Sequence, residues 1–294
     1  MIKVEPSNNI FKTISVQTTY KCQMKCANCY LGDMLNNDKY QDVDITKFEK
    51  AIKQLPNRCD IRFIGAEPTL NSNLFELVRI ARSAGHRPSL LTNGLKLRSY
   101  EYTRALKKAG INMLGISMNG CLEDELYQLM DNGKYAKQKM LALENCFKLK
   151  IMPHINVILI PENAHAISKL VDYIEELRLK YNFTKYPVMI RFKSVGQVGN
   201  YMKTITYDLN KMIQILNFKL GGLQDINYKV NGYIERNTCT FKLKSGLLGK
   251  ITDWTLDDEG IPDAGSTRRG ILTNDYKVQP FFEYYSDIEE AKWK

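Results

Sequence analysis

Hydrophobic and polar positions along the first two thirds of the chain predict strands and helices in turn. Short apolar runs bounded by polar turns indicate buried strands. Strands that alternate with helices are typical of βα units built around a parallel sheet. The pattern therefore predicts an α/β fold with six such strands, at Thr13–Thr19, Asp60–Ile64, Pro88–Thr92, Met113–Ser117, His154–Ile160 and Val188–Lys193.

Amphipathic segments that predict helices lie in most of the intervals between these strands. Asp44 is placed to cap a helix that runs to about Gln54, and Asn71 to cap one that runs through Arg82 and ends at Gly85. The apolar period of the later intervals predicts three more helices, Ser99–Ala109, Lys134–Leu149 and Asn163–Lys180.

The alternation ends at about Tyr207. A helix is predicted at Leu209–Leu220, and apolar Val278, Phe281 and Phe282 indicate a segment that packs back onto the body. We expect a main domain over residues 1–205 and a small α+β region over 206–294 that caps the substrate. The strands of that region follow a hairpin pattern, at Tyr228–Ile234, Thr238–Leu243 and Leu247–Trp254.

The composition is that of a globular protein with a basic surface. The chain has 294 residues, of which 44% are hydrophobic, so it can bury a large core. Its formal net charge of +10 makes anionic partners plausible, such as nucleotides, nucleic acid or acidic peptides. The lysines are scattered and no nucleic-acid-binding motif accompanies them, so nucleic acid is not favoured.

The sequence predicts a cytoplasmic protein. No apolar run approaches the ~20 residues that span a bilayer, and the N-terminal residues lack the apolar core of a signal peptide. Seven cysteines, an odd number, fit a reducing compartment better than a disulfide framework.

Three of those cysteines form the most informative motif. Cys22, Cys26 and Cys29 follow the first predicted strand, so one short loop can offer three thiolates to three corners of a cubane iron–sulfur cluster. A stable ferredoxin-type cluster needs four cysteine ligands, so the fourth iron is left open for an exogenous ligand. The alternative is structural zinc, which normally takes four Cys or His ligands. The three histidines lie far from the motif and show no paired spacing: His86, His154 and His165.

Polar turns follow three further predicted strands. Glycine, asparagine and serine are ordinary turn residues, so each turn taken alone is weak evidence of a site. Together they place polar groups at successive strand ends, where the βα loops of a parallel barrel converge. The turns are Gly65-Ala66-Glu67-Pro68, Thr92-Asn93-Gly94 and Ser117-Met118-Asn119-Gly120.

The cysteine motif and these turns, in this order, resemble the radical S-adenosylmethionine (SAM) enzymes. The resemblance implies a partial (β/α)6 barrel, a [4Fe-4S] cluster on Cys22, Cys26 and Cys29, and SAM bound to the open iron. It also implies an electron donor such as flavodoxin or ferredoxin, and a small-molecule or peptide substrate. In the family the protein positions these cofactors, which carry the chemistry.

The resemblance also implies roles for the strand-end residues. Glu67, with the backbone of Gly65 and Ala66, is expected to hold the SAM amino group, provided that Ala66 does not need a positive φ. Further SAM contacts are expected from Thr92, Asn93, Ser117, Asn119, Asn156 and Arg191. For Asn156 the alternative is a half-buried polar group without a cofactor role.

The chain departs from the family pattern at two points. Many relatives carry an aromatic residue or histidine before the third cysteine, where adenine packs, whereas this chain has Asn28 there and Tyr30 just after. Many also carry an arginine after the fourth strand that holds the SAM carboxylate. The stretch 126–140 has none, and Lys134 or Arg191 could replace it.

A lone cysteine in the C-terminal third suggests a particular reaction. Cys239 could donate a hydrogen atom to a substrate radical, as in radical SAM epimerases of the aminoglycoside type. The chain resembles these in size, in this late cysteine and in its C-terminal stretch from Arg268-Arg269-Gly270 to Pro280-Phe281-Phe282. The alternatives are a buried Cys239 in an enzyme that rearranges or cross-links a nucleotide or peptide without thiol quenching, and a non-enzymatic iron–sulfur or zinc protein. Cys59, Cys121 and Cys146 are expected to be core residues.

Overall fold

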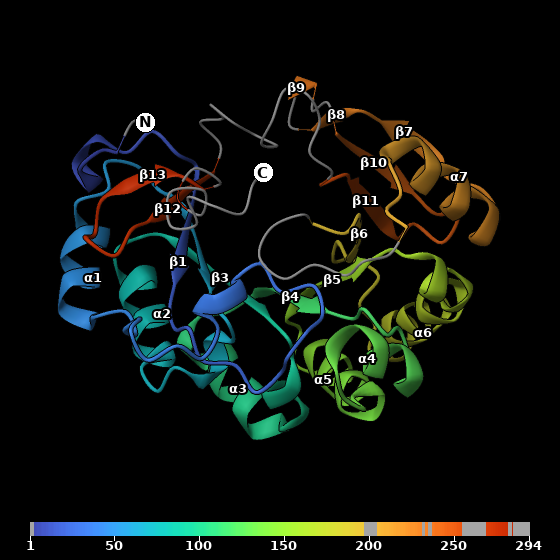
Figure 1. Ribbon diagram of the computed structural model, residues 1–294, viewed down its shortest axis with the longest axis horizontal. Coiled ribbons are helices and arrows are strands. Elements are labelled where there is room, and N and C mark those ends of the chain that lie inside the picture. Colours follow the sequence, from blue (N-terminus) through green and yellow to red (C-terminus); the bar gives the residue numbers. More distant parts are fainter. Residues whose placement is uncertain are drawn as a thin grey trace.

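A curved, mostly parallel sheet forms the centre of the molecule (Figure 1). The computed structural model describes residues 3–196, 205–230, 233–234, 237–254, 269–281 and 284. Over this part of the chain the main sheet has 11 strands in the order β13-β12-β1-β2-β3-β4-β5-β6-β11-β10-β7. The α/β class predicted from the sequence is confirmed.

Six consecutive parallel strands make up the middle of the sheet, and they match the six predicted strands closely. They are β1 (Thr13–Gln17), β2 (Asp60–Ile64), β3 (Arg87–Thr92), β4 (Met113–Ser117), β5 (Met152–Ile158) and β6 (Met189–Lys193). A small hairpin of β8 (Lys229–Val230) and β9 (Tyr233–Ile234) lies outside this sheet.

The helices pack on the outer face of the curved sheet. Outward side chains such as Ile14, Phe63, Leu114, Ile155 and Phe192 are at most 1% exposed and join one large apolar core with the helices. Neighbouring positions along each strand point to the inner face instead, because successive side chains alternate. The outer face therefore stabilises the fold and leaves the inner face for polar residues.

The helix boundaries follow local capping. Asp44 caps α1 by accepting a hydrogen bond from the Lys47 backbone at 2.8 Å, and Asp208 caps α7 in the same way. The helices are α1 (Ile45–Lys53), α2 (Leu74–Ser83), α3 (Tyr100–Ala109), α4 (Asp124–Asp131), α5 (Ala136–Lys148), α6 (Ile167–Lys180) and α7 (Leu209–Lys219). Short 3-10 turns lie at Pro6–Asn8, Gly32–Met34, Pro68–Leu70, Leu95–Arg98 and Pro161–Ala166.

Three details of the helices differ from the sequence prediction. Helix α4 was not predicted, and Asn132 with a left-handed φ of 55° separates it from α5. Helix α2 begins after Asn73, while the side chain of Asn71 instead forms a turn by accepting a bond from the Asn73 backbone at 2.7 Å. The segment predicted to start a helix at Asn163 opens as a 3-10 turn.

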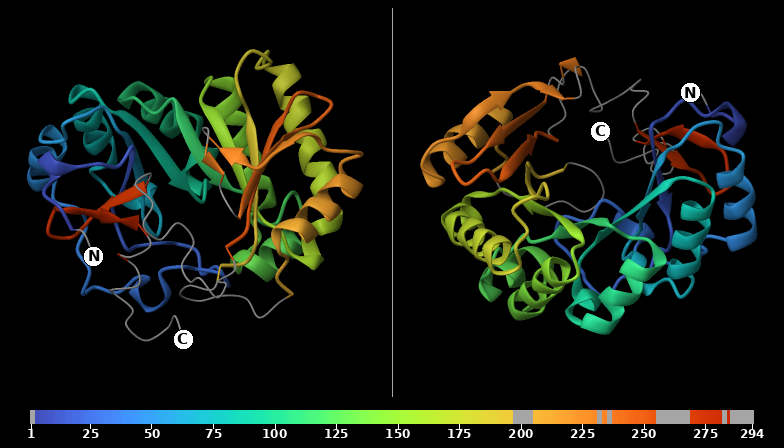
Figure 2. Two further views of the ribbon diagram at one scale, coloured as in Figure 1. Left: turned by 90° about the horizontal axis from the view of Figure 1, so that it is seen from above. Right: turned by 180° about the vertical axis from the view of Figure 1, so that it is seen from behind.

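The C-terminal third extends both edges of the same sheet. β11 (Leu248–Thr252) pairs parallel with β6, followed by β10 (Thr238–Lys242) and β7 (Gln224–Asn227). At the other edge β12 (Arg269–Leu272) pairs parallel with β1, followed by β13 (Val278–Pro280). Figure 2 shows these two groups at opposite ends of the curve. The expected return of Val278 onto the body is confirmed, because its side chain is fully buried.

A division at residue 205 and a role for residues 206–294 in covering the substrate stay predictions. Arg268 and Phe282 lie outside the described residues.

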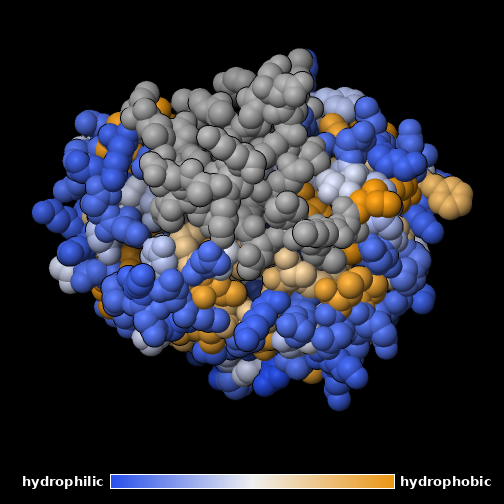
Figure 3. All heavy atoms as spheres, viewed as in Figure 1, coloured by the Kyte–Doolittle hydropathy of each residue, from blue (hydrophilic) through white to orange (hydrophobic). Residues whose placement is uncertain are grey.

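The described surface is mostly hydrophilic on the face seen in Figure 3, and its apolar residues form small separate patches. Among the described residues, no helix combines the length and the apolar composition that crossing a lipid bilayer requires.

Candidate active site

The three cysteines lie on the loop after β1, at the carboxyl edge of the parallel strands. Asn36 holds the start of this loop, because its side chain accepts a bond from the Cys22 backbone at 2.8 Å and donates one to the Cys22 carbonyl at 3.1 Å. The Ala27 backbone donates to the Met130 carbonyl of α4 at 2.9 Å. The loop is thus fixed from two sides.

All three thiols are partly buried, and this raises their pKa values. Burial is the main cause of the rise to about 11 at Cys22, with the charges of Glu67 and Cys29 adding to it. The pKa of Cys26 is also raised, mainly by burial and then by Asp131, and that of Cys29 by burial. Such thiols become thiolates readily only when bound to a metal centre.

In the described part of the chain, no three Cys, His, Asp or Glu side chains converge as ligands of one metal ion. In a cubane each thiolate binds a different iron atom, so the sulfurs need not converge on one point. The amide oxygen of Asn28, beside Cys29, is buried and has no hydrogen-bond partner among the described residues, so it leaves a polar position for a bound group.

Glu67 links the ends of β2 and β3. Its side chain is fully buried. One carboxylate oxygen accepts bonds from the Thr69 backbone at 3.0 Å and from the hydroxyls of Thr69 and Thr92, each at 2.6 Å. The other accepts from the Asn93 backbone at 2.6 Å, and the Asn93 side chain lies 3.7 Å from the Cys22 sulfur. Glu67 thus positions two strand ends against the cysteine loop.

The turn that carries Glu67 needs glycine only at its first position. A Cβ on Gly65 would lie 2.8 Å from the Thr19 carbonyl oxygen. Ala66 is not among the residues with positive φ, so alanine is tolerated there. The hydroxyl of Tyr30 donates to the Gly65 carbonyl at 3.3 Å, which brings Tyr30 to the same strand end.

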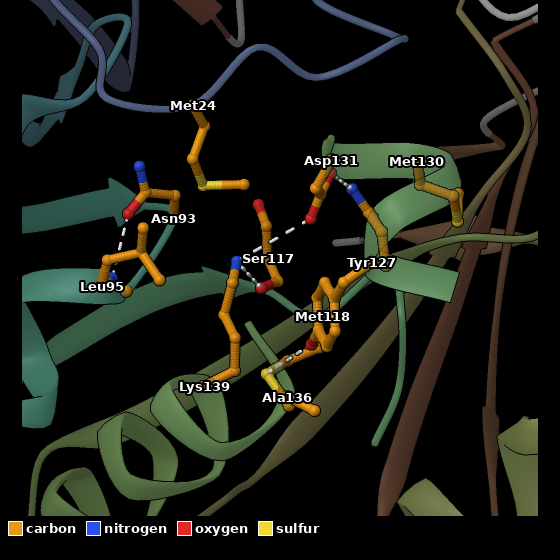
Figure 4. Close-up of polar contacts among 12 residues, drawn as sticks. Met24, Asn93, Leu95, Ser117, Met118, Tyr127, Met130, Asp131, Ala136 and Lys139 are labelled. Carbon is orange, nitrogen blue, oxygen red and sulfur yellow. Dashed lines mark hydrogen bonds and ion pairs between the residues drawn. The ribbon is translucent and has the colours of Figure 1, made fainter. Parts of the chain in front are cut away.

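A buried polar network lies below the cysteine loop (Figure 4). Lys139 rises from α5, has no exposed side-chain surface, and donates to the Ser117 carbonyl at 2.8 Å. Its ammonium lies 4.0 Å from Asp131 and 5.4 Å from the centre of the Tyr127 ring. Asn119 donates to Asp131 at 3.1 Å.

Sequence reasoning missed Lys139, although it lies within the stretch 126–140 that lacks an arginine. Burial lowers its pKa, while the charges of Asp131 and Cys26 act in the opposite direction. Lys139 lies on the buried stripe of α5 together with Ala136 and Leu143. A lysine at a core position of an amphipathic helix was the signal that could have identified it.

The strand register places Asn156 and Arg191 together on the inner face. Ser117 pairs with Asn156, and Asn156 pairs with Arg191. The amide oxygen of Asn156 is buried and has no partner within the described residues. The pKa of Arg191 is lowered to about 10, first by burial and then by Arg62.

Cys239 lies on the opposite face of the sheet. It pairs with Ile251, which pairs with Phe192, and all three side chains are buried in the main core with α7. The next residue along β10, Thr240, lies on the inner face and pairs with Lys250. The structure therefore places Cys239 on the face of the sheet that the helices cover, whereas Ser117, Asn156 and Arg191 lie on the inner face. Cys59, Cys121 and Cys146 are buried, as predicted.

A parallel βα sheet with a three-cysteine loop and polar strand ends along one edge defines a class of iron–sulfur enzymes that bind a cofactor at the open iron. The chain belongs to the radical SAM superfamily, whose family model matches residues 16–174, more than half of its length. Proteins of this family bind a [4Fe-4S] cluster and SAM, which are therefore the cofactors.

Relatives and solved structures agree with this assignment. The 7,8-dihydro-6-hydroxymethylpterin dimethyltransferase of Methanocaldococcus jannaschii is 28% identical over 171 residues, 55% of this chain and 33% of the relative. The GTP 3',8-cyclase of Clostridium acetobutylicum is 26% identical over 200 residues, 65% of this chain and 58% of the relative. The chain thus spans between a third and three fifths of the length of these two relatives.

Among solved structures, Streptococcus suis SuiB bound to the precursor peptide SuiA has a TM-score of 0.59 at 16% identity, covering 71% of this chain and 45% of SuiB. Native anSMEcpe with bound AdoMet has a TM-score of 0.53 at 19% identity, covering 71% of this chain and 60% of that one. These similarities show the fold.

Proposed function

We propose that this chain binds a [4Fe-4S] cluster through Cys22, Cys26 and Cys29 and uses SAM to remove a hydrogen atom from a small-molecule or peptide substrate. When bound and reduced, the cluster supplies the electron that cleaves SAM into methionine and the 5'-deoxyadenosyl radical that abstracts the hydrogen. The observation that carries the proposal is the partly buried three-thiol loop on the carboxyl edge of a radical SAM sheet.

The chain's own residues position the reactants. Glu67 holds the Thr92-Asn93 turn beside Cys22, so the rim of the cluster site is rigid. We assign the SAM amino group to the Gly65-Ala66-Glu67 turn, and the SAM carboxylate to Lys139 beside Ser117. Lys139 lies within the stretch that lacks the arginine, and the charges of Cys26 and Cys22 both act on it.

Four other polar residues complete the proposed SAM site. Asn28 and Tyr30 flank the adenine position, and Asn119 and Asn156 face the ribose. An unpartnered amide oxygen on Asn28 and another on Asn156 support these assignments, because a bound ligand can supply the missing donor.

We further propose that the reaction proceeds without quenching by Cys239. Epimerisation with this thiol as hydrogen donor would require it to face the substrate, and its register with Ile251 argues against that. A rearrangement, cyclisation or cross-linking of the substrate fits this placement better. A Cys239→Ala variant tests this choice, because turnover should persist, whereas an epimerase would stall.

The test of the main proposal is anaerobic reconstitution with iron and sulfide, followed by dithionite and SAM. We expect 5'-deoxyadenosine from the wild type and none above background from Cys22→Ala. Cys146→Ala is the matched control, because it removes a buried thiol far along α5 and should leave the product intact. Equal product from Cys22→Ala and the wild type would overturn the proposal.

A further inference from the structure

A group of cationic side chains shares the inner face of the sheet. Arg191 pairs in register with Lys250, and Lys193 lies two residues further along β6 on the same face. Arg62 on β2 pairs with Ser15, which pairs with Ile271, and Arg269 lies two residues before Ile271. The helices occupy the other face, so these cations point away from the apolar core.

Within the described residues, three of these cations have no carboxylate bound to them. The one hydrogen bond of Arg191 goes to the sulfur of Met189 on its own strand, at 3.3 Å. Lys193 has neither a hydrogen bond nor an ion pair there. Asp60 acts on Arg62 only at a distance and is itself paired with Arg87 at 2.5 Å. The positive charges of Arg62, Arg191 and Lys193 are therefore not neutralised by a bound carboxylate within the described part of the chain.

The cations also act on one another. Burial and the charges of Arg191, Arg269, Arg62 and Lys250 lower the pKa of Lys193 to about 7. Burial, Arg191 and Arg62 likewise lower the pKa of His154 to about 3. Like charges held this close destabilise the fold unless a bound anion offsets them.

Two uncharged groups on the same face also lack a partner. The hydroxyl of Ser89, which pairs in register with Arg62, is on a side chain only 4% exposed and has no hydrogen bond among the described residues. The amide oxygen of Asn156, which pairs with Arg191, is likewise without one on a residue 9% exposed. Buried polar groups are normally satisfied, so both point to bound ligands. The Ser89 hydroxyl can donate to an anion, whereas the Asn156 oxygen needs a donor and belongs to the ribose position proposed above.

We infer that the substrate is a phosphorylated small molecule whose phosphate groups bind Arg62, Arg191 and Lys193, with Ser89 as an additional donor. This inference rests on the proposed function and names its substrate class. SAM cannot fill the role, because its single carboxylate is outweighed by its own ammonium and sulfonium charges. Guanidinium groups match phosphate oxygens in pairs, and several of them select a polyanion over a single carboxylate.

The test is calorimetric binding of inorganic tripolyphosphate to the reconstituted, SAM-loaded protein. We expect saturable binding that weakens with salt. Arg62→Gln and Lys193→Gln should each weaken it about tenfold to a hundredfold, the usual effect of losing a charge-assisted hydrogen bond. Arg79→Gln is the matched control, because Arg79 is exposed on α2 and should leave the affinity unchanged.

Arg62→Lys keeps the charge but loses the paired guanidinium donors, so its affinity should lie between those of Arg62→Gln and the wild type, which separates charge recognition from a damaged fold. Absence of saturable binding by the wild type would overturn the inference, and so would equal affinity in Arg62→Gln, Lys193→Gln and Arg79→Gln. Formation of 5'-deoxyadenosine by the wild type without tripolyphosphate is measured in parallel. If it forms while tripolyphosphate does not bind, the substrate class alone is wrong. If it does not form, the proposed function is wrong whatever the binding result.

Discussion

Glu67 is the residue whose replacement tests the architecture of the site most sharply. Its buried carboxylate accepts four hydrogen bonds, from the Thr69 backbone, the hydroxyls of Thr69 and Thr92, and the Asn93 backbone. Glu67→Gln keeps the shape of the side chain but replaces one acceptor oxygen with an NH₂ group. In either amide orientation, this group faces a backbone N–H that cannot accept a bond.

The cost follows from this count. At least one backbone donor loses its acceptor, which costs about 1–3 kcal/mol when buried, and the remaining bonds lose their charge assistance. We therefore expect a loss of about 3 kcal/mol in the free energy of unfolding. This corresponds to a Tm lowered by roughly 5 °C in a chain of this size. The SAM affinity should fall as well, because the Thr92-Asn93 turn loses its anchor.

Anaerobic denaturant unfolding of the reconstituted protein and calorimetric SAM titration provide the two measurements. Glu76→Gln is the control, because Glu76 is exposed in the first turn of α2 and should cost less than about 1 kcal/mol. A loss below about 1 kcal/mol in Glu67→Gln would refute the reasoning, since it would mean that the four bonds are not formed together in solution.

Three further predictions concern packing, charge and pH. Gly94→Ala should lower the free energy of unfolding by about 1–2 kcal/mol because its φ is +83°, and by about 1–3 kcal/mol more because the new Cβ would lie 2.6 Å from Ile116. Gly85→Ala has a similar φ of +87° but its Cβ meets no atom within 4 Å, so denaturant unfolding should show only the loss of about 1–2 kcal/mol that the backbone causes. Lys139→Met should lower the free energy of unfolding by about 3–5 kcal/mol, because it leaves Asp131 buried without its cation. Lys148→Met on the same helix also removes a 4.0 Å ion pair, but the Lys148 side chain is 44% exposed, so the loss should be under about 1 kcal/mol. Similar losses in the two variants would contradict the buried network. The pKa of His154 is about 3 in the folded state, below its ordinary 6.5, so the unfolded chain takes up the proton first as the pH is lowered. The free energy of unfolding should therefore decrease as the pH drops below 6.5. Between pH 7.5 and 5.5 the wild type should lose about 1 kcal/mol relative to His154→Gln. Parallel pH curves of the two proteins would rule this out.

The central strands and the cysteine loop were predictable because their signals are local. Runs such as Asp60–Ile64 alternate inner and outer side chains, and the strand ends carry the polar turns. The outward position of Cys239 also had a local signal, since Thr238 and Thr240 flank it while Phe241 lies two residues along on its face. The interpretation of Cys239 as a hydrogen-atom donor rested on its being a lone cysteine, whereas the two-residue period of the strand places it on the same face as Phe241.

The joining of β11 to β6 and of β12 to β1 could not be read from the sequence. Thr13 pairs with Arg269 across almost the whole chain, and no local pattern specifies such a partner. The addition of Lys250 and Arg269 to the cations of the inner face depends on these two pairings. In the sequence the same residues lie scattered among other lysines and arginines, so only the net charge of +10 was visible.

The central claim is that three thiols hold a [4Fe-4S] cluster whose fourth iron is open to SAM. Electron paramagnetic resonance of the anaerobically reconstituted and reduced protein tests it most directly, with and without SAM. We predict the signal of a reduced [4Fe-4S] cluster that changes when SAM is added and that is lost in Cys26→Ala. A spectrum that SAM leaves unchanged, or one that survives the loss of Cys26, would contradict the account.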